Sequence, residues 1–214
     1  MRLHSITDRA TVKRVARTYS SERRSRQAAQ TRDDVVRAAI ELFGTTGWLG
    51  TTIGAIAARA GVAVETVYKA VGGKKVLLHA AMDAAVVGDT APVPLVDRAE
   101  MAAVRTGTRA QRIAAAAKVT AEIHDRSAGV WLAVVEAAAS DPEIDRWRRE
   151  LEDGRRAEVR RAAAHVLGRS PDDQLVTMIW LLFGPEAYLK LVRDDGLSRA
   201  DYQRFLIRSL ERLA

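Results

Sequence analysis

Two short amphipathic segments joined by a glycine stand out between Thr51 and Leu78. In the first, apolar residues recur at i, i+3, i+4 and i+7, which gives a helix one narrow apolar face; they are Ile53, Ile56, Ala57 and Ala60. Gly61 follows, at the position where a left-handed residue commonly ends a helix. The same spacing then returns in Val64, Val67, Tyr68 and Val71. The pattern predicts two short helices that cross at close range, with the small Ala57 at their contact.

The flanking residues predict one helix before this pair and one after it. The first would begin at Thr31, whose hydroxyl can cap it, and would end at Gly44 and Gly47, with Trp48 closing the small core. The second would span residues 73–88. Two prolines and a glycine in residues 88–95 then break the helical periodicity. We therefore expect an N-terminal domain over residues 29–88, a linker over 89–97 and a second domain over 98–214.

The second domain has helical periodicity and no strand pattern of useful length. Two X-Pro steps, Asp141-Pro142 and Ser170-Pro171, are typical of helix starts. The predicted helices cover residues 98–106, 109–125, 128–139, 142–167, 171–193 and 198–213. The expected fold class is all-α.

The basic residues are concentrated in the N-terminal part of the chain. The net charge is +7, and 48% hydrophobic with 29% charged residues is the balance of a soluble globular protein. Residues 1–80 contain 14 Lys/Arg against 6 Asp/Glu, whereas residues 81–214 contain 20 against 21. A general bias toward arginine would have made both parts basic. The division indicates a polyanion-binding end on a nearly neutral body.

Residues 1–28 are rich in arginine and lysine, with only Asp8 and Glu22 opposing them. Such a segment can lie along phosphates or enter a minor groove, as other basic arms do. A leader without a role has the same composition. The sequence leaves both interpretations open for this basic, flexible arm.

Several functional classes find no support in the sequence. The chain has no cysteine, its four histidines are scattered without ligand spacing, and it has no nucleophile elbow or phosphate-binding glycine loop. The longest apolar stretches fall short of the roughly 20 residues of a spanning helix, and residues 1–30 lack the apolar core of a secretory signal. We expect no enzyme activity, no catalytic residue, no metal, no cofactor and no membrane partner. We expect the protein to be cytoplasmic.

The paired segments carry a recognisable motif, Thr-Thr, Ile-Ala-x-x-Ala-Gly-Val, Thr-x-Tyr and Lys-x-x-Leu-Leu. Its residues are Thr51, Thr52, Ile56, Ala57, Ala60, Gly61, Val62, Thr66, Tyr68, Lys74, Leu77 and Leu78. The motif resembles that of the TetR-type, tetracycline-repressor-like transcriptional regulators, over roughly residues 29–88. Ala70 and Val71 depart from the family, which usually has a His or Tyr and a Phe after the tyrosine. The resemblance implies a three-helix helix-turn-helix DNA-binding domain, followed by a C-terminal helical bundle for ligand binding and dimerisation.

The second helix of the pair would contact DNA through its first residues, because a recognition helix enters the major groove by its N-terminal end. Its candidate base contacts are Ala63, Val64, Glu65 and Thr66, with Tyr68 and Lys69 one turn further on. Glu65 can accept from a cytosine amine, and it equally fits a solvated surface charge. By the resemblance, the phosphate contacts would be Thr51, Thr52, Tyr68 and Lys74.

The last two predicted helices are apolar enough to bury one face and still offer a second contact surface, which favours a homodimer on double-stranded operator DNA. Inside the second domain, a small, mostly apolar effector would lie near His124, Trp131, Glu136, Met178 and Phe183, although His124 and Glu136 also fit ordinary core packing. The resemblance implies repression, with effector release from a pseudo-palindromic operator. Activation, a helical enzyme and a non-specific DNA-coating protein remain as alternatives.

Overall fold

The computed structural model describes residues 7–90 and 95–213, and for residues 7–22 and 96 it describes the backbone alone. Every element in these ranges is helical, which confirms the expected all-α class. The N-terminal elements are α1 (Thr7–Gly50), α2 (Ile53–Ala60), α3 (Val64–Ala70) and α4 (Lys74–Val87). The body contains η1 (Leu95–Asp97), α5 (Ala99–Arg105), α6 (Arg109–Ala138), α7 (Pro142–Leu167), α8 (Asp173–Leu182), α9 (Pro185–Tyr188), η2 (Leu189–Asp194) and α10 (Arg199–Leu213).

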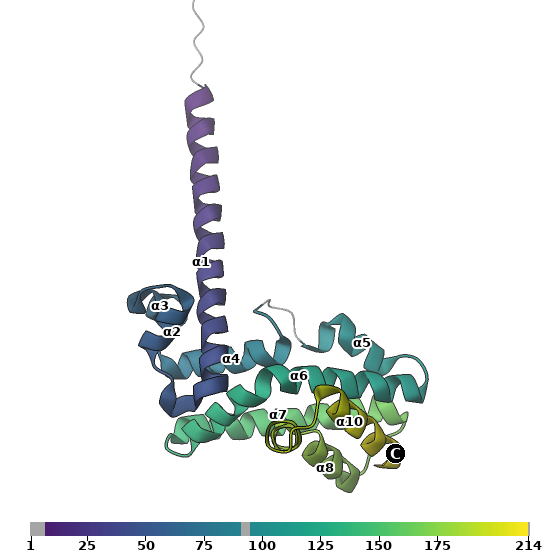
Figure 1. Cartoon of the computed structure of the whole chain (residues 1–214). Helices are drawn as coiled ribbons and strands as arrows, with labels where there is room; N and C mark the ends of the chain where they lie inside the picture. The colour runs from purple at the N-terminus through teal and green to yellow at the C-terminus, as the bar shows by residue number, and fades with distance from the viewer. Residues whose placement is uncertain (1–6, 91–94, 214) are drawn as a thin grey trace, which may run out of the picture.

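The first helix is much longer than predicted. It begins at Thr7, so the expected start at Thr31 is wrong: the Thr31 hydroxyl donates to the carbonyl of Gln27 inside the helix, 2.9 Å away, and caps nothing. Most of the predicted arm is therefore helical, and its residues 1–6 lie outside the described part of the chain. In Figure 1 the N-terminal portion of α1 projects away from the body, past α2 and α3. Gly44 continues the helix, whereas Gly47 interrupts it with φ 70° and ψ −172°.

The paired helices are packed as the spacing predicts. Gly61 is left-handed (φ 69°), and its amide donates to carbonyls at the end of α2. Trp48 stacks on Phe43 with ring centroids 6.0 Å apart, closing this end of the core. The buried residues that hold α1 to α4 together include Val35, Ala39, Phe43, Ile56, Ala57, Val67, Leu77 and Leu78.

Two of the helices predicted for the body differ in the structure. Residues 109–138 form the single helix α6 instead of two helices, because nothing near residues 126–127 breaks it and the Ser127 hydroxyl is satisfied by the carbonyl of Ile123. The segment predicted as one helix over 171–193 is divided by Gly184 and Pro185 into α8, α9 and η2. Proline removes an amide donor and clashes with the preceding turn of a helix, so the break was readable in the sequence.

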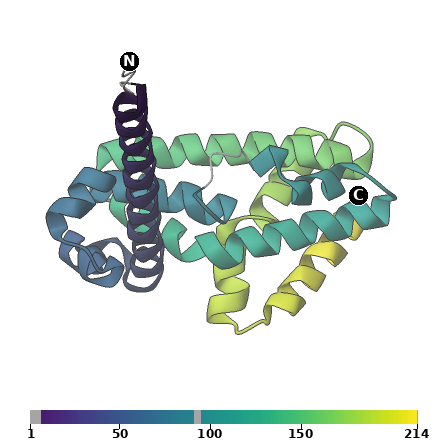
Figure 2. The same cartoon turned by 90° about the horizontal axis from the view of Figure 1, so that it is seen from above.

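The N-terminal domain and the body share one hydrophobic core. The cluster that contains Phe43 and Leu78 also includes Val134 of α6 and Ile144 of α7. Figure 2, viewed close to the axis of α1, shows α6 and α7 running lengthwise through the body. Where α1 crosses α6, a Cβ added to Gly129 would lie only 2.7 Å from the carbonyl oxygen of Gly44. The backbones meet at that crossing without room for a side chain.

One segment, Asp173–Asp194, is long and apolar enough by composition to cross a membrane. Core helices of soluble proteins meet the same criterion. Here the segment is broken at Pro185, and Leu175, Ile179 and Tyr188 lie in the second core cluster. The segment is therefore a broken, partly buried part of the body.

Candidate nucleic-acid interface and effector cavity

Helix α3 presents its outer face to solvent while its inner face is fixed in the core. Val67 is wholly buried, whereas Tyr68 is 55% and Val64 38% exposed. Ala63 lies at the N-cap with extended backbone, and Glu65 and Lys69 are exposed beside it. Val64 and Tyr68 are four residues apart and so share one helix face, which leaves both available to contact another molecule.

The residues that depart from the family motif hold the end of α3 in place. Arg32 of α1 donates to the carbonyl of Ala70 at 3.1 Å, which satisfies one of the free carbonyls of the helix end. Val71 is partly buried against the shared core. The interior of α1 thus fixes the C-terminal end of the short helix without the aromatic pair.

The two threonines before α2 have different roles. The Thr52 side chain caps α2 by accepting from the amide of Ala55 at 3.1 Å, and it remains exposed. Thr51 is completely buried, and its hydroxyl donates to the carbonyl of Gly47 at 2.6 Å. The expected phosphate contact of Thr51 is therefore inconsistent with the structure, since its hydroxyl is turned into the protein.

Lys74 begins α4 beside the end of α1. Its ammonium lies 4.2 Å from the centroid of the Trp48 ring and donates to the carbonyl of Trp48. Partial burial lowers the pKa of Lys74, and the nearby carboxylate of Glu136 acts in the opposite direction. The lysine ties α4 to the helix-turn-helix whether or not it also contacts a phosphate.

A cavity of about 630 Å³ lies inside the body, bounded by α4, α5, α6, α7 and α8. Its size is within the usual range for small-molecule sites. The structure brings three of the predicted residues together on its wall, His124, Trp131 and Phe183. Most other lining residues are apolar, among them Met82, Val86, Val104, Val119, Leu151 and Val159.

Two of the predicted cavity residues lie elsewhere. Glu136 accepts from the backbone amide of Trp48 at 2.6 Å, so it joins α6 to the end of α1. Met178 packs on the second core cluster and does not line the cavity. Both were expected inside the second domain, but membership of that domain does not determine which residues face its cavity.

The polar groups of the cavity wall are few and have defined partners. The Nδ1 of buried His124 lies 3.0 Å from the hydroxyl of Tyr202. Burial, with a smaller contribution from the charge of Arg155, lowers the pKa of His124 to about 3, so this ring is neutral near pH 7. The indole of Trp131 donates to Glu186 at 2.8 Å. Burial of Tyr202 raises the pKa of its hydroxyl.

Arg155 is a lining residue that the sequence interpretation missed. It interrupts the apolar seam of α7 between Leu151 and Val159, each four residues away. Residues at i and i+4 share a helix face, so an arginine at this position is a charge on an apolar face. That signal was present in the sequence.

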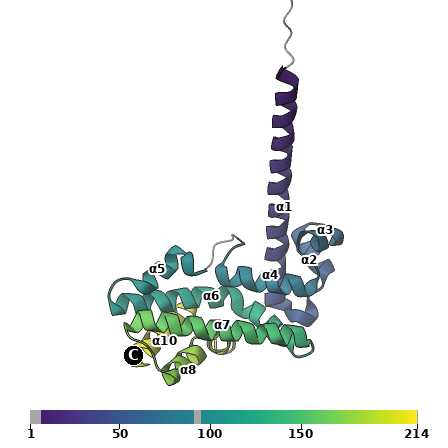
Figure 3. The ribbon, with the colours of Figure 1, turned by 180° about the vertical axis from the view of Figure 1, so that it is seen from behind.

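Helix α4 joins the cavity to the helix-turn-helix. Its Met82 and Val86 line the cavity, and its Leu77 and Leu78 are buried against α1 to α3. Figure 3 shows α4 leading from the side of α1 to the body, above α6 and α7. Arg126 of α6 donates to the carbonyls of Ala85 and Val86, at 3.2 and 3.1 Å, and so holds the far end of α4.

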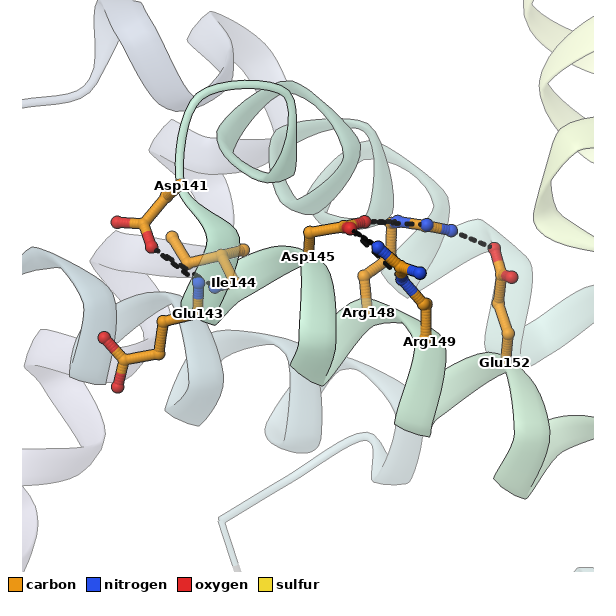
Figure 4. A network of polar contacts seen from close by, with 7 residues as sticks. All are labelled: Asp141, Glu143, Ile144, Asp145, Arg148, Arg149 and Glu152. Carbon is orange, nitrogen blue, oxygen red and sulfur yellow. Dashed lines mark hydrogen bonds and ion pairs between the residues drawn. The ribbon is translucent and has the colours of Figure 1, made fainter.

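The start of α7 forms a second attachment for α4. Lys75 lies 2.6 Å from an oxygen of Asp141 and 3.0 Å from Glu143. Asp141 also caps α7 by accepting from the amides of Glu143 and Ile144 (Figure 4). Hydrogen bonds from Lys75 and from these amides lower the pKa of Asp141.

One side of α7 carries a group of ion pairs. Asp145 pairs with Arg149 and also with Arg148 (Figure 4). Glu152 pairs with Arg148. Arg156 donates to Thr177 at 2.7 Å. Within the described residues no cluster of side chains could hold a metal ion.

Together, these observations describe a helix-turn-helix with an exposed second helix, joined to a helical body that contains a cavity. Residues 35–81 match the family model described as "Bacterial regulatory proteins, tetR family". This match confirms the resemblance for the N-terminal domain, which is of the TetR type.

Two further comparisons concern the whole chain. A crystal structure described as "the putative transcriptional regulator from Pseudomonas aeruginosa PAO1" is similar with a TM-score of 0.57 and 19% identity, over 85% of this chain and 89% of that chain. At this identity the similarity shows the fold, including the helical body. Comparison with curated proteins gave no match.

Proposed function

We propose that this protein represses transcription from a pseudo-palindromic operator and leaves the DNA when a small, mostly apolar effector enters the cavity. The observation that carries the proposal is the double role of α4. The same helix lines the cavity through Met82 and Val86 and packs on the helix-turn-helix through Leu77 and Leu78. Occupancy of the cavity would therefore reach α3 through the core that α4 shares with α1 to α3.

The DNA-contacting surface would combine the exposed face of α3 with the helix ends beside it. Ala63, Val64, Glu65 and Thr66 would face base edges, and Thr52, Tyr68, Lys69 and Lys74 would contact phosphates. Lys74 has three ammonium hydrogens, of which one is used on the Trp48 carbonyl. We leave Thr51 out of this surface because it is buried.

The repressor would act as a homodimer through α8 and α10, because two half-sites on a duplex require two recognition helices. Leu181 of α8 is 58% exposed in the single chain, which supports a contact surface there. Effector binding would favour a dimer whose recognition helices are misspaced for DNA. A coupling of about 1–3 kcal/mol per site is typical of such systems. A cytoplasmic location follows from this role.

Selection of bound duplexes from a random pool tests the DNA-binding part of the proposal. An enriched inverted repeat, with half-sites about one duplex turn or a small multiple apart, is the expected result. The double variant Thr66→Ala with Tyr68→Ala should lose this enrichment. A pool without an enriched repeat would favour the DNA-coating alternative, and unchanged selection by the double variant would exclude α3 as the reading helix.

A further inference from the structure

We infer that the effector carries a carboxylate or similar organic anion at one end of an apolar body, and that Arg155 is the residue that binds this anionic head. The inference deepens the proposed function by naming the chemical class of the ligand. It rests on a cation that has no ion pair among the described residues and lies on the wall of a mainly apolar cavity.

Arg155 is partly buried and lines the cavity from α7. Its guanidinium lies 4.8 Å from the centroid of the Trp180 ring, and one nitrogen donates to the carbonyl of Trp180 at 2.9 Å. A guanidinium has five donor hydrogens in a planar fork. Among the described residues, no carboxylate lies within 4.0 Å of it, so the stacking and this one bond fix the group and leave donors for a ligand.

The two carboxylates whose charges act on Arg155 have other partners. Glu186 accepts the indole hydrogen of Trp131, and Glu152 pairs with Arg148. Burial lowers the pKa of Arg155 and the charges of these two carboxylates oppose that change. An arginine remains charged at physiological pH even so. A buried charge is costly without a partner, and a ligand carboxylate would supply that partner with two parallel hydrogen bonds.

The rest of the wall favours an anion over a cation near Arg155. His124 is neutral near pH 7, and its Nδ1 is occupied by Tyr202, which leaves Nε2 as its second polar atom. The other charged lining residues are Glu150, Glu158 and Arg161. All three are exposed to solvent, and Glu158 pairs with Arg161. The remaining surface is mainly aliphatic and aromatic, so it suits an apolar body.

Calorimetry on the full-length protein without DNA tests the inference with matched ligand pairs. The probes are decanoate against decanamide, and 4-phenylbutyrate against 4-phenylbutyramide. At least one carboxylate should bind about 10- to 100-fold more tightly than its amide, the range expected for hydrogen bonds to a charged group. Equal affinities within both pairs, or no binding by either carboxylate, would overturn the inference.

Two arginines on the same tryptophan provide the variant and its control. Arg155→Gln should remove the preference for the carboxylate, and Arg155→Lys should retain part of it, because lysine keeps the charge without the fork. Arg156→Gln is the control, since Arg156 also stacks on Trp180, at 5.5 Å, but does not line the cavity. Melting curves establish that each variant folds. Loss of the preference in Arg156→Gln, or its retention in Arg155→Gln, would contradict the assignment.

Adding operator DNA separates this inference from the proposed function. Carboxylate binding that depends on Arg155 and releases the operator supports both. Carboxylate binding that leaves the operator bound supports the anion site and rejects its role as the effector site. A preference for the amide would reject the anion site even if the operator is released.

Discussion

At the level of single residues, neighbouring side chains with the same chemistry differ in what they contact. Thr51 and Thr52 both belong to the family motif. The Thr51 hydroxyl is buried against the Gly47 carbonyl, whereas the Thr52 hydroxyl caps α2 at the surface. The family resemblance implied the same phosphate role for both. The kink at Gly47 turns the chain so that only Thr52 lies outside, and this turn is a tertiary feature.

Thr51→Val should lower the free energy of unfolding while leaving the salt dependence of DNA binding unchanged. Valine keeps the shape but leaves the Gly47 carbonyl without its donor, at a cost of about 1–3 kcal/mol. Urea unfolding and operator titrations at several salt concentrations measure the two effects. Thr66→Val is the matched control, expected to reduce operator affinity with little loss of stability. A Thr51→Val protein of normal stability whose salt slope falls by about 0.9 would restore the phosphate contact.

His124 should make the fold sensitive to acid. Its pKa is about 3 in the folded protein, below the ordinary value of 6.5, because burial disfavours the charged ring. The unfolded chain therefore binds more protons as the pH falls below about 6.5. The stability contributed by the neutral ring is present above that pH and is lost toward pH 3, by up to about 1.4 kcal/mol per pH unit.

Denaturant unfolding between pH 7 and pH 4 measures this loss, with His124→Gln compared to the unchanged protein. The variant should show a shallower decline, since the glutamine does not titrate. The exposed His165 provides the control, and His165→Gln should follow the original curve. Parallel curves for His124→Gln and the original protein would show that the ring does not control acid stability.

At the level of elements, local patterns predicted the short helices well and the long ones poorly. The i, i+3, i+4, i+7 spacing and Gly61 were sufficient for α2 and α3, because these helices depend on local apolar faces and a left-handed turn. Residues 23–30 of α1 are exposed and are polar or alanine, so no apolar face marks them as helical in the sequence. Their helical state is set by continuity with the packed half of α1.

The cavity residues also show how far the sequence pattern can predict the structure. At 100° per residue, His124 and Trp131 are only about 20° apart around α6, whereas Glu136 lies about 120° from His124. Sequence proximity to apolar residues suggested Glu136, and the helix geometry directs it to Trp48 instead. Arg155 could have been found from its place on the α7 seam. The contributions of α4 and α10 to the cavity wall could not have been found in this way, because they depend on the packing of distant segments.

The projecting part of α1 should contribute affinity for DNA without contributing sequence preference. Deletion of residues 1–28 removes eight Lys/Arg and two acidic residues. The selected operator should be unchanged, and the salt slope of binding should fall by about 0.9 for every phosphate that this segment neutralises. Fluorescence anisotropy across a salt series measures the slope. Deleting residues 1–6, which removes one arginine, is the control, and a full loss of operator preference in the longer deletion would assign α1 a reading role.

At the level of the whole molecule, the two predicted domains fold around a common core rather than on either side of a free linker. Helices α1 and α4 pack on α6, and Lys75 and Arg126 attach both ends of α4 to the body. Helix α1 also packs on α2 and α3, so α1 connects α4 to the helix-turn-helix. This arrangement supports transmission of effector occupancy by movement of one helix.

Leu181→Glu should convert the proposed dimer to monomers. A charge at this exposed apolar position of α8 would have to be desolvated in the interface, which is costly without a partner. Light scattering coupled to size exclusion measures the mass in solution. Leu49→Glu, at a 76% exposed apolar residue at the end of α1, is the control and should keep the mass of the original protein. A dimer that survives Leu181→Glu would place the interface elsewhere.

The crossing of Gly129 over Gly44 limits how the parts of this protein can be recombined. Any side chain at position 129 would collide with the backbone of α1, while a Cβ on Gly44 would meet nothing within 4 Å. The requirement for glycine therefore applies to position 129 in the body and not to position 44 in α1. A chimera that joins this DNA-binding domain to another effector-binding body at residues 89–97 would need a glycine at the matching site of its new α6, however well the junction itself is chosen.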